Sequence, residues 1–395
     1  MSKPLGGLKV VELGQLIAGP FAGKFFAEFG AEVIKIEPPG GDPLRKWRSL
    51  HRGTSLWWYV QNRNKKSVTA DLRLPEGQEV ARRIAKGADV VIENFRPGTL
   101  EKWGLGYARL AADNPGLVML RLSGFGQSGP YRDRAGFGAI GESMGGLRYV
   151  TGFPDRPPVR PNLSIGDALA ALHGVIGVLM ALHHRDANGG KGQIVDVALY
   201  EAVFNMMEGA LPEYDMFKES RERTGSNLTG IVPSNTYLTR DGQHVVIGAN
   251  ADSIFKRLMV LIGRSDLADD PTLADNAGRA GRAGELDAAI GAWTGGRAAE
   301  EALKILSDAQ VPSGKIYSMA DIASDAQYLA RDMIRQVTLA DGTALKVPGI
   351  VPKLSETPGD IDWAGPALGE HTEAVLAAHG YGSAEIAGLR ARKAV

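Results

Sequence analysis

The sequence predicts an α/β protein with a doubly wound, mostly parallel sheet in a large Rossmann-like domain, accompanied by a smaller α+β domain. Two observations predict this fold. Short β-branched segments alternate with segments of helical periodicity along the first 211 residues, a pattern that builds right-handed crossovers and a parallel sheet. The composition then changes near residue 212, and a chain of 395 residues is too long for one compact core.

The expected strands are short and apolar. Residues 8–13 (LKVVEL) are β-branched and flanked by glycine, and residues 32–37 (EVIKIE) alternate between apolar and charged side chains. Further strands are expected at residues 67–72, 89–93, 118–122 and 193–197.

Helical segments separate these strands. Small and aromatic side chains recur at helical spacing over residues 18–29, and residues 76–86 end before Gly87, a favourable C-cap. Residues 164–184 are apolar but short and interrupted by glycine, so we expect a buried helix rather than a membrane span. Residues 199–211 are expected to be helical as well.

The domain boundaries follow from composition. The large domain is predicted over residues 1–211, and the polar segment 212–230 reads as a linker. Residues 231–325 begin with a hairpin that turns at Asp241-Gly242 and continue as helices, which predicts the small domain. The tail, 326–395, carries a strand pair and a final helix.

Charge and composition exclude several classes of protein. The 45 basic and 45 acidic residues give a formal net charge of +0, so nothing favours nucleic acid or an anionic membrane as a partner. The absence of cysteine excludes disulfides, thiolate ligands and a cysteine nucleophile. No signal-peptide h-region is present, and the seven histidines do not cluster as metal ligands. We expect a cytoplasmic protein without a metal.

Ligands of open α/β sheets bind at the carboxyl ends of the strands. That rule selects the loops at residues 13–20, 37–43, 71–73, 93–98 and 123–130. Basic residues recur nearby, which fits either a solvated basic surface or a site for a cofactor with several phosphates. They are Arg45, Lys46, Lys65, Lys66, Arg73, Arg96, Lys102, Arg132 and Arg134.

Asp167 lies in the motif SIGD (164–167), at the start of the long apolar helix. An acid in the first helical turn is favoured by the helix dipole, so an ordinary capping role would explain it. A carboxylate that remains ionised there could also attack a thioester. The sequence alone leaves both interpretations open.

Several segments together resemble the family III CoA-transferases, the group that includes formyl-CoA and carnitine CoA-transferases. The sequence looks closest to members that use succinyl-CoA with dicarboxylic acids. The matching segments span nearly the whole chain: IAGPFA (17–22), GAEVIKIEPP (30–39), NRNKKS (62–67), ENFRPG (93–98), GFGQSGP (124–130), SIGD (164–167), GKGQ (190–193) and LGEHT (368–372).

The resemblance implies an interlocked homodimer, in which residues 326–395 return to complete the large domain. It implies that Asp167 is the nucleophile and that coenzyme A enters as a substrate, as an acyl-CoA, with no permanently bound cofactor. The implied contacts to coenzyme A are Ile17, Ala18, Leu72, Arg73, Asn94, Phe95, Arg96, Lys102, Arg134 and Ala135.

Two departures from the family pattern bear on the substrate. The small domain lacks the glycine run of formyl-CoA transferases and has GIVPSNTY (230–237) or GAN (248–250) instead, so oxalate and formate are not expected. Gly138 stands where many relatives carry an acid. An α-methylacyl-CoA racemase is the alternative function, but its histidine is replaced here by Phe137, which cannot carry a proton. A third hypothesis is a non-catalytic CoA-binding scaffold, which the intact aspartate motif disfavours.

The expected reaction moves CoA from succinyl-CoA to a carboxylic acid, which we expect to be dicarboxylic, through an aspartyl anhydride and an aspartyl-CoA thioester. A second carboxylate on the substrate needs a cation or an amide as its partner. Arg148, Arg160 and Asn235 are candidates for that role.

Overall fold

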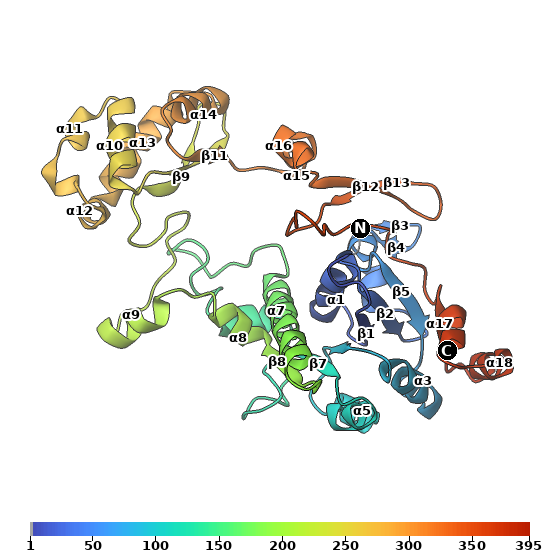
Figure 1. Ribbon diagram of the computed structural model, residues 1–395. Helices are drawn as coiled ribbons and strands as arrows, with labels where there is room; N and C mark the ends of the chain where they lie inside the picture. Colours follow the sequence, from blue (N-terminus) through green and yellow to red (C-terminus); the bar gives the residue numbers. More distant parts are fainter. Residues whose placement is uncertain (1–2) are drawn as a thin grey trace. The chain divides into compact units, whose positions relative to one another are not determined.

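The computed structural model of the protein describes residues 3–395 (Figure 1). The chain forms two compact units. The large unit comprises the residues up to Leu147 together with Pro161–Glu208 and Ala330–Val395, and the small unit comprises Arg148–Arg160 and Gly209–Leu329.

A six-stranded sheet forms the centre of the large unit, with the order β5-β2-β1-β6-β7-β8. Every neighbouring pair in it is parallel. The first strand along the chain therefore lies in the middle, and the winding reverses between β1 and β6, as in a doubly wound fold. The predicted α/β class is confirmed. The strands are β1 (Lys9–Glu12), β2 (Glu32–Glu37), β5 (Lys65–Thr69), β6 (Val90–Glu93), β7 (Val118–Ser123) and β8 (Ile194–Ala198).

Helices cover both faces of this sheet. Val10 and Val11 point to opposite faces because side chains alternate along a strand, and each belongs to a separate core. On the face of Val10 pack α1 (Ala18–Glu28) and α7 (Ile165–Ala187). The face of Val11 is covered by α3 (Pro75–Ala85), α5 (Tyr107–Asp113), α17 (Thr372–Ala378) and α18 (Ser383–Ala391).

Helix α7 is long and apolar enough to cross a membrane by length and composition alone, a test that core helices of soluble proteins also pass. Ala170, Ala171 and Val178 are fully buried against the sheet. The opposite face is exposed, with Ile176 at 52% and Met180 at 67% of their accessible surface. The expected burial of this helix therefore holds for one face only.

The C-terminal segment joins the large unit through the motif at residues 62–67. Asn64 Nδ2 donates to Asp360 O at 2.7 Å, and Arg63 donates to Pro348 O at 2.6 Å. Next to them, Thr69 N donates to Thr372 Oγ1 at 3.0 Å. These bonds attach β12 (Ile334–Thr338), β13 (Ala344–Pro348) and α17 to the edge strand β5.

The small unit contains a three-stranded antiparallel sheet, β11-β10-β9, whose core includes Ile247, Leu258 and Ile290. The predicted hairpin turns at Gly242, which has a φ of +74°. Helix α9 (Ala210–Phe217) occupies part of the segment predicted as a linker. The other elements here are β9 (Ser234–Leu238), β10 (His244–Gly248), α10 (Asp252–Leu261), α11 (Ser265–Ala268), η2 (Pro271–Leu273), α12 (Asn276–Gly281), α13 (Ala283–Gly295), α14 (Ala299–Asp308), β11 (Ser313–Lys315) and α15 (Met319–Ser324).

Short elements fill the connections, and most have no counterpart in the sequence prediction. A two-stranded hairpin follows β2 and leads into α2, whose N-cap Ser55 accepts from Trp57 N. These elements are η1 (Pro43–Lys46), β3 (Leu50–His51), β4 (Thr54–Ser55), α2 (Leu56–Gln61), α4 (Thr99–Lys102), α6 (Gly138–Met144), α8 (Leu199–Phe204) and α16 (Ala326–Ala330).

Candidate active site

The loops after β1 and β6 meet at the point where the winding of the sheet reverses. Gln15 N donates to Asn94 Oδ1 at 2.8 Å, and Asn94 Nδ2 donates back to Gln15 O at 2.8 Å. The approach is close, because a Cβ on Gly14 would lie 2.9 Å from Asn94 Oδ1. The predicted contact Asn94 thus uses its side-chain amide to join the two loops.

Three further side chains hold the loop after β1 in place through hydrogen bonds to its backbone. Leu16, at a φ of +64°, donates its N–H to the Asp42 carboxylate at 3.1 Å. Gln61 Nε2 donates to Ile17 O at 3.0 Å, and Lys35 Nζ donates to Gly14 O at 2.8 Å. A left-handed leucine persists only where its surroundings enforce it. The loop that carries Ile17 and Ala18 into the N-terminus of α1 is therefore fixed in shape.

Buried charges lie beneath this loop. Glu12 accepts from Lys35 at 2.9 Å and from Lys65 at 2.7 Å, and all three side chains are buried. Burial lowers the pKa of Lys65 to about 8, against the attraction of Glu12. Burial also opposes the charge on Lys35, but Asp42 and Glu12 outweigh it and raise the pKa of that lysine. A Cβ on Gly23 would overlap Glu12 Oε2, so α1 packs directly on the carboxylate.

This arrangement removes two of the basic residues from the candidates for phosphate binding. Lys65 is enclosed beside Glu12, and Arg45 is bound to Glu37 at 2.8 Å in the interior. Lys66 pairs with Glu32 at 2.5 Å. The basic pattern in this part of the chain therefore serves ion pairs within the protein.

The loop after β6 is shaped by Glu93, the last residue of the strand. Its carboxylate accepts from Phe95 N at 2.8 Å and from Arg121 Nε at 2.7 Å. Arg121 also pairs with Glu101 at 2.8 Å. Burial raises the pKa of Glu93 to about 7, although Arg121 pulls it down. Arg121 was not among the predicted site residues, because its only signal in the sequence is a charge inside the apolar segment 118–122.

The remaining predicted contacts lie at the same edge of the sheet. Leu72 and Arg73 follow β5, and Arg73 is 78% exposed with its guanidinium on Asp71 at 2.7 Å. Arg134 lies over the ring of Tyr131 at 3.6 Å in the loop after β7. The predicted contacts Arg96, Arg134 and Ala135 in these loops are exposed, and so is Lys102 at the end of α4.

Asp167 belongs to the first turn of α7. This helix connects β7 to β8, which are parallel neighbours, so it runs antiparallel to both and begins at their carboxyl ends. Asp167 is half-buried, and its carboxylate lies against Gly138, the first residue of α6. Nearby, the fully buried Glu142 accepts from Gly166 N at 3.4 Å. The nucleophile candidate therefore stands at the same edge of the sheet as the loops after β1 and β6.

The residues proposed to hold a second substrate carboxylate belong to the small unit. Asn235 is engaged there: its Nδ2 donates to Asp287 at 2.9 Å, and its Oδ1 accepts from Ser226 Oγ at 2.8 Å. Its amide is thus bound within the protein. Arg148 and Arg160 lie in the segment that joins the small unit. Within residues 3–395 we find no group of three or more histidine, aspartate or glutamate side chains placed to hold a metal.

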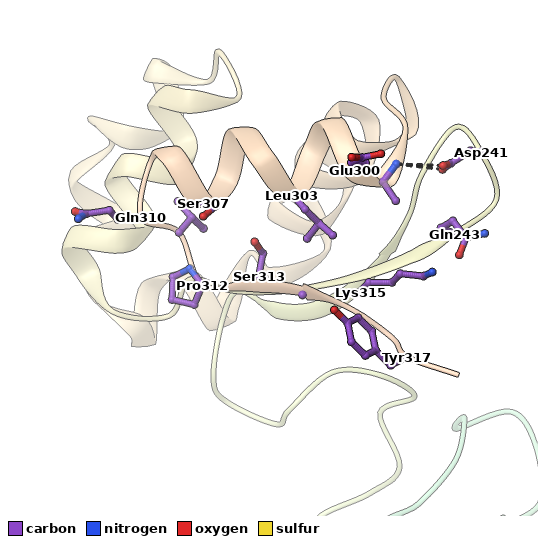
Figure 2. A pocket seen from close by; sticks show the side chains of 13 residues that line it. Asp241, Gln243, Glu300, Leu303, Ser307, Gln310, Pro312, Ser313, Lys315 and Tyr317 are labelled. Atoms are coloured by element: carbon purple, nitrogen blue, oxygen red, sulfur yellow. Dashed lines mark hydrogen bonds between the residues drawn. The ribbon is translucent and has the colours of Figure 1, made fainter. Parts of the chain in front are cut away.

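A groove of about 860 Å³ lies in the small unit between α14 and β11 (Figure 2). Two of its charged side chains are engaged inside the unit: Asp241 accepts from Ala299 N at 3.2 Å, and Lys315 donates to Asp321 at 2.8 Å. None of the predicted site residues lines this groove.

Comparison with known proteins identifies the family. CoA-transferase family III matches residues 5–372. The chain is 52% identical over 376 residues to the succinyl-CoA–D-citramalate CoA-transferase of Chloroflexus aurantiacus. This alignment covers 95% of this chain and 93% of that protein. The chain is also 42% identical over 378 residues to the beta subunit of the succinyl-CoA–L-malate CoA-transferase of the same species, covering 94% and 93%. The crystal structure of a CaiB/BaiF family protein from Brucella suis matches with a TM-score of 0.84 at 36% identity, covering 96% and 100%. The chain therefore belongs to CoA-transferase family III and is a CoA-transferase.

Proposed function

We propose that this enzyme moves CoA from succinyl-CoA to a short dicarboxylic acid, with Asp167 as the nucleophile. The observation that carries the proposal is the 52% identity, over 95% of the chain, to a relative named for succinyl-CoA and D-citramalate. The second relative, at 42% identity, is named for succinyl-CoA and L-malate. Both names pair the same donor with a hydroxylated dicarboxylate.

The proposed reaction begins with attack of the Asp167 carboxylate on the thioester carbonyl, which expels the CoA thiolate and forms a mixed anhydride. The thiolate then attacks the Asp167 carbonyl, releasing succinate and leaving an aspartyl-CoA thioester. The acceptor carboxylate attacks this thioester and forms a second anhydride with release of thiolate. Attack of the thiolate on the acceptor's acyl carbon yields the new CoA ester and restores Asp167. One thioester replaces another, so no ATP is needed.

Two features of the site support this chemistry. An aspartate in the first turn of α7 is favoured as the anion by the helix dipole, so it remains available as a nucleophile. The loops after β1 and β6 are held rigidly by Asn94 and Asp42. Rigid backbone donors can stabilise a developing oxyanion without rearrangement during the reaction, a role worth about 3 kcal/mol per donor.

The direct test supplies succinyl-CoA together with a panel of carboxylates and identifies new CoA esters by mass. The panel includes citramalate, malate, glutarate, oxalate and acetate. We expect esters of citramalate, malate or glutarate, and none of oxalate or acetate. Efficient transfer to monocarboxylates would refute the proposed acceptor class. Incubation of the protein with a 2-methylacyl-CoA in heavy water tests the racemase alternative, because a racemase would incorporate deuterium at the α-carbon. We expect no incorporation, since Phe137 offers no proton for that reaction.

Replacement of Asp167 provides the test of the nucleophile. With succinyl-CoA and no acceptor, the native protein is expected to gain the mass of one CoA, bound as a thioester that hydroxylamine removes. Asp167→Asn keeps the size of the side chain but is a far weaker nucleophile, so we expect no adduct and a loss of transfer of at least about 10⁴-fold. Transfer at the native rate by Asp167→Asn would exclude the mechanism.

We also propose that the enzyme is a homodimer, as the family resemblance implies. The exposed apolar face of α7 supports this, and so does α9, which has no buried residue of its own although Leu211, Met216 and Phe217 are apolar. Exposed apolar surface of this kind marks protein–protein contacts.

A further inference from the structure

Helix α6 packs through glycine against its neighbours. A Cβ on Gly141 would lie 2.8 Å from Leu199 Cβ, and one on Gly145 would lie 2.6 Å from Val203 Cβ, both in α8. A Cβ on Gly166, at the start of α7, would lie 2.9 Å from Gly138 O. Backbone therefore meets backbone or Cβ at each contact, and α6 has little room to shift.

Gly138 is the member of this set that faces the carboxylate of Asp167. A Cβ at position 138 would overlap Asp167 Oδ2 and would lie 2.8 Å from its Cγ and 3.3 Å from Oδ1. In this chain the carboxyl group of Asp167 therefore occupies the space that a Cβ at position 138 would need, and the carboxyl group would have to move to admit one.

The backbone of Gly138 does not itself require glycine. The residue is the first of α6, and its φ lies outside the left-handed region, so no backbone strain there calls for glycine. The local conformation therefore does not call for glycine, and the group that a Cβ would meet first is the carboxylate of Asp167.

We propose that Gly138 is a positioning residue, which seats the Asp167 carboxylate directly on the backbone of α6. We call this contact between the Asp167 carboxylate and Gly138 the seat. Its effect on the reaction rate rests on the proposed function, whereas the contact itself depends only on packing. A methyl group at position 138 would push the carboxylate away by about 1 Å, and a displacement of that size at a reacting group can cost about 10²-fold in rate.

A double-mutant cycle tests the seat independently of catalysis. The melting temperature is measured for the native protein, Gly138→Ala, Asp167→Ala and the double variant. We expect Gly138→Ala to lower it in the native background but to leave it unchanged or raise it beside Asp167→Ala, where no carboxylate remains to be displaced. Equal shifts in the two backgrounds would overturn the proposal.

The kinetic test measures the rate at which the CoA adduct forms from succinyl-CoA, together with the Kd of CoA. For Gly138→Ala we expect the rate to fall about 100-fold with the Kd unchanged. Gly284→Ala is the matched control, because Gly284 lies in α13 and a Cβ there meets nothing within 4 Å. A native rate in Gly138→Ala would overturn the seat. Absence of an adduct in the native protein would instead reject the proposed function, while the melting cycle would still report on the seat.

Discussion

The side chain of Asn94 bonds in both directions to the backbone of Gln15 and so joins two loops that are 79 residues apart in the chain. This pairing imitates the two hydrogen bonds of a strand pair at a place where no strand continues. Because β1 and β6 are neighbours in the sheet, the bond closes the gap at the position where ligands of doubly wound folds bind.

Asn94→Ala should weaken substrate use more than stability. Removal of the amide leaves the N–H and C=O of Gln15 to water and lets the loop after β1 move, so we expect kcat/KM for the CoA ester to fall about tenfold or more. Steady-state kinetics with succinyl-CoA measure this. Asn188→Ala, at the exposed C-terminus of α7, is the control; equal kcat/KM in the two variants would mean that the bond between the loops has no catalytic role.

Glu93 gives the stability of the protein a distinct pH dependence. Its pKa is raised to about 7 in the folded protein, while an unfolded glutamate titrates near its ordinary value of about 4.3. The folded state therefore binds more protons between these values. The stabilisation is complete below the unfolded pKa and is lost as the pH rises through 7.

Urea unfolding of the native protein and Glu93→Gln at pH 5 and pH 8 measures this contribution. The glutamine cannot ionise, so the stability of the native protein relative to the variant should fall over this range, by up to about 3 kcal/mol. A difference that stays constant with pH would show that Arg121 keeps Glu93 ionised throughout.

The sequence indicated some of these residues and missed others for a physical reason. Asp167 and Asn94 stand in recognisable motifs, so they could be named in advance. Arg121 and Gln15 matter through partners that are far away in the chain: Glu93 and Arg121 are 28 residues apart. Such pairs follow from strand order and helix packing, which local sequence patterns do not encode.

At the scale of elements, apolar strands were predicted to within a few residues because both faces of this sheet are covered. The strand expected at residues 67–72 lies instead at Lys65–Thr69. Lys65 is a buried charge neutralised by Glu12, and a hydrophobic pattern cannot reveal a lysine that is buried by ion pairing. Within the motif at residues 62–67, Arg63 and Asn64 attach the C-terminal segment and Lys65 is an internal ion-pair partner.

Helix α9 shows the opposite limit. The sequence predicts the end of a helix at residue 211 and a polar linker from residue 212, yet the chain forms a helix from Ala210 to Phe217 in which no side chain is buried. A helix that packs on no core of its own chain need not show the regular apolar stripe from which a helix is predicted. A second protein surface that covers the helix would account for its exposed apolar side chains.

At the scale of the whole molecule, α7 has two apolar faces and the chain itself covers only one. The sheet buries Ala170, Ala171 and Val178, while Leu172, Ile176 and Met180 remain exposed. A face of this kind would be unfavourable in water. A second copy of the chain would remove it from solvent, in agreement with the proposed homodimer.

A charge placed on that face tests the assembly. We expect the native protein to have twice the chain mass of 42.0 kDa in light scattering, and Ile176→Asp to be monomeric or strongly weakened in self-association, because a buried unpaired carboxylate costs several kcal/mol. Ile176→Val keeps the surface apolar and should remain dimeric. Circular dichroism establishes that each variant is folded. A folded Ile176→Asp that keeps the native mass would show that this face of α7 lies outside the interface and that the dimer, if formed, uses other surfaces such as α9.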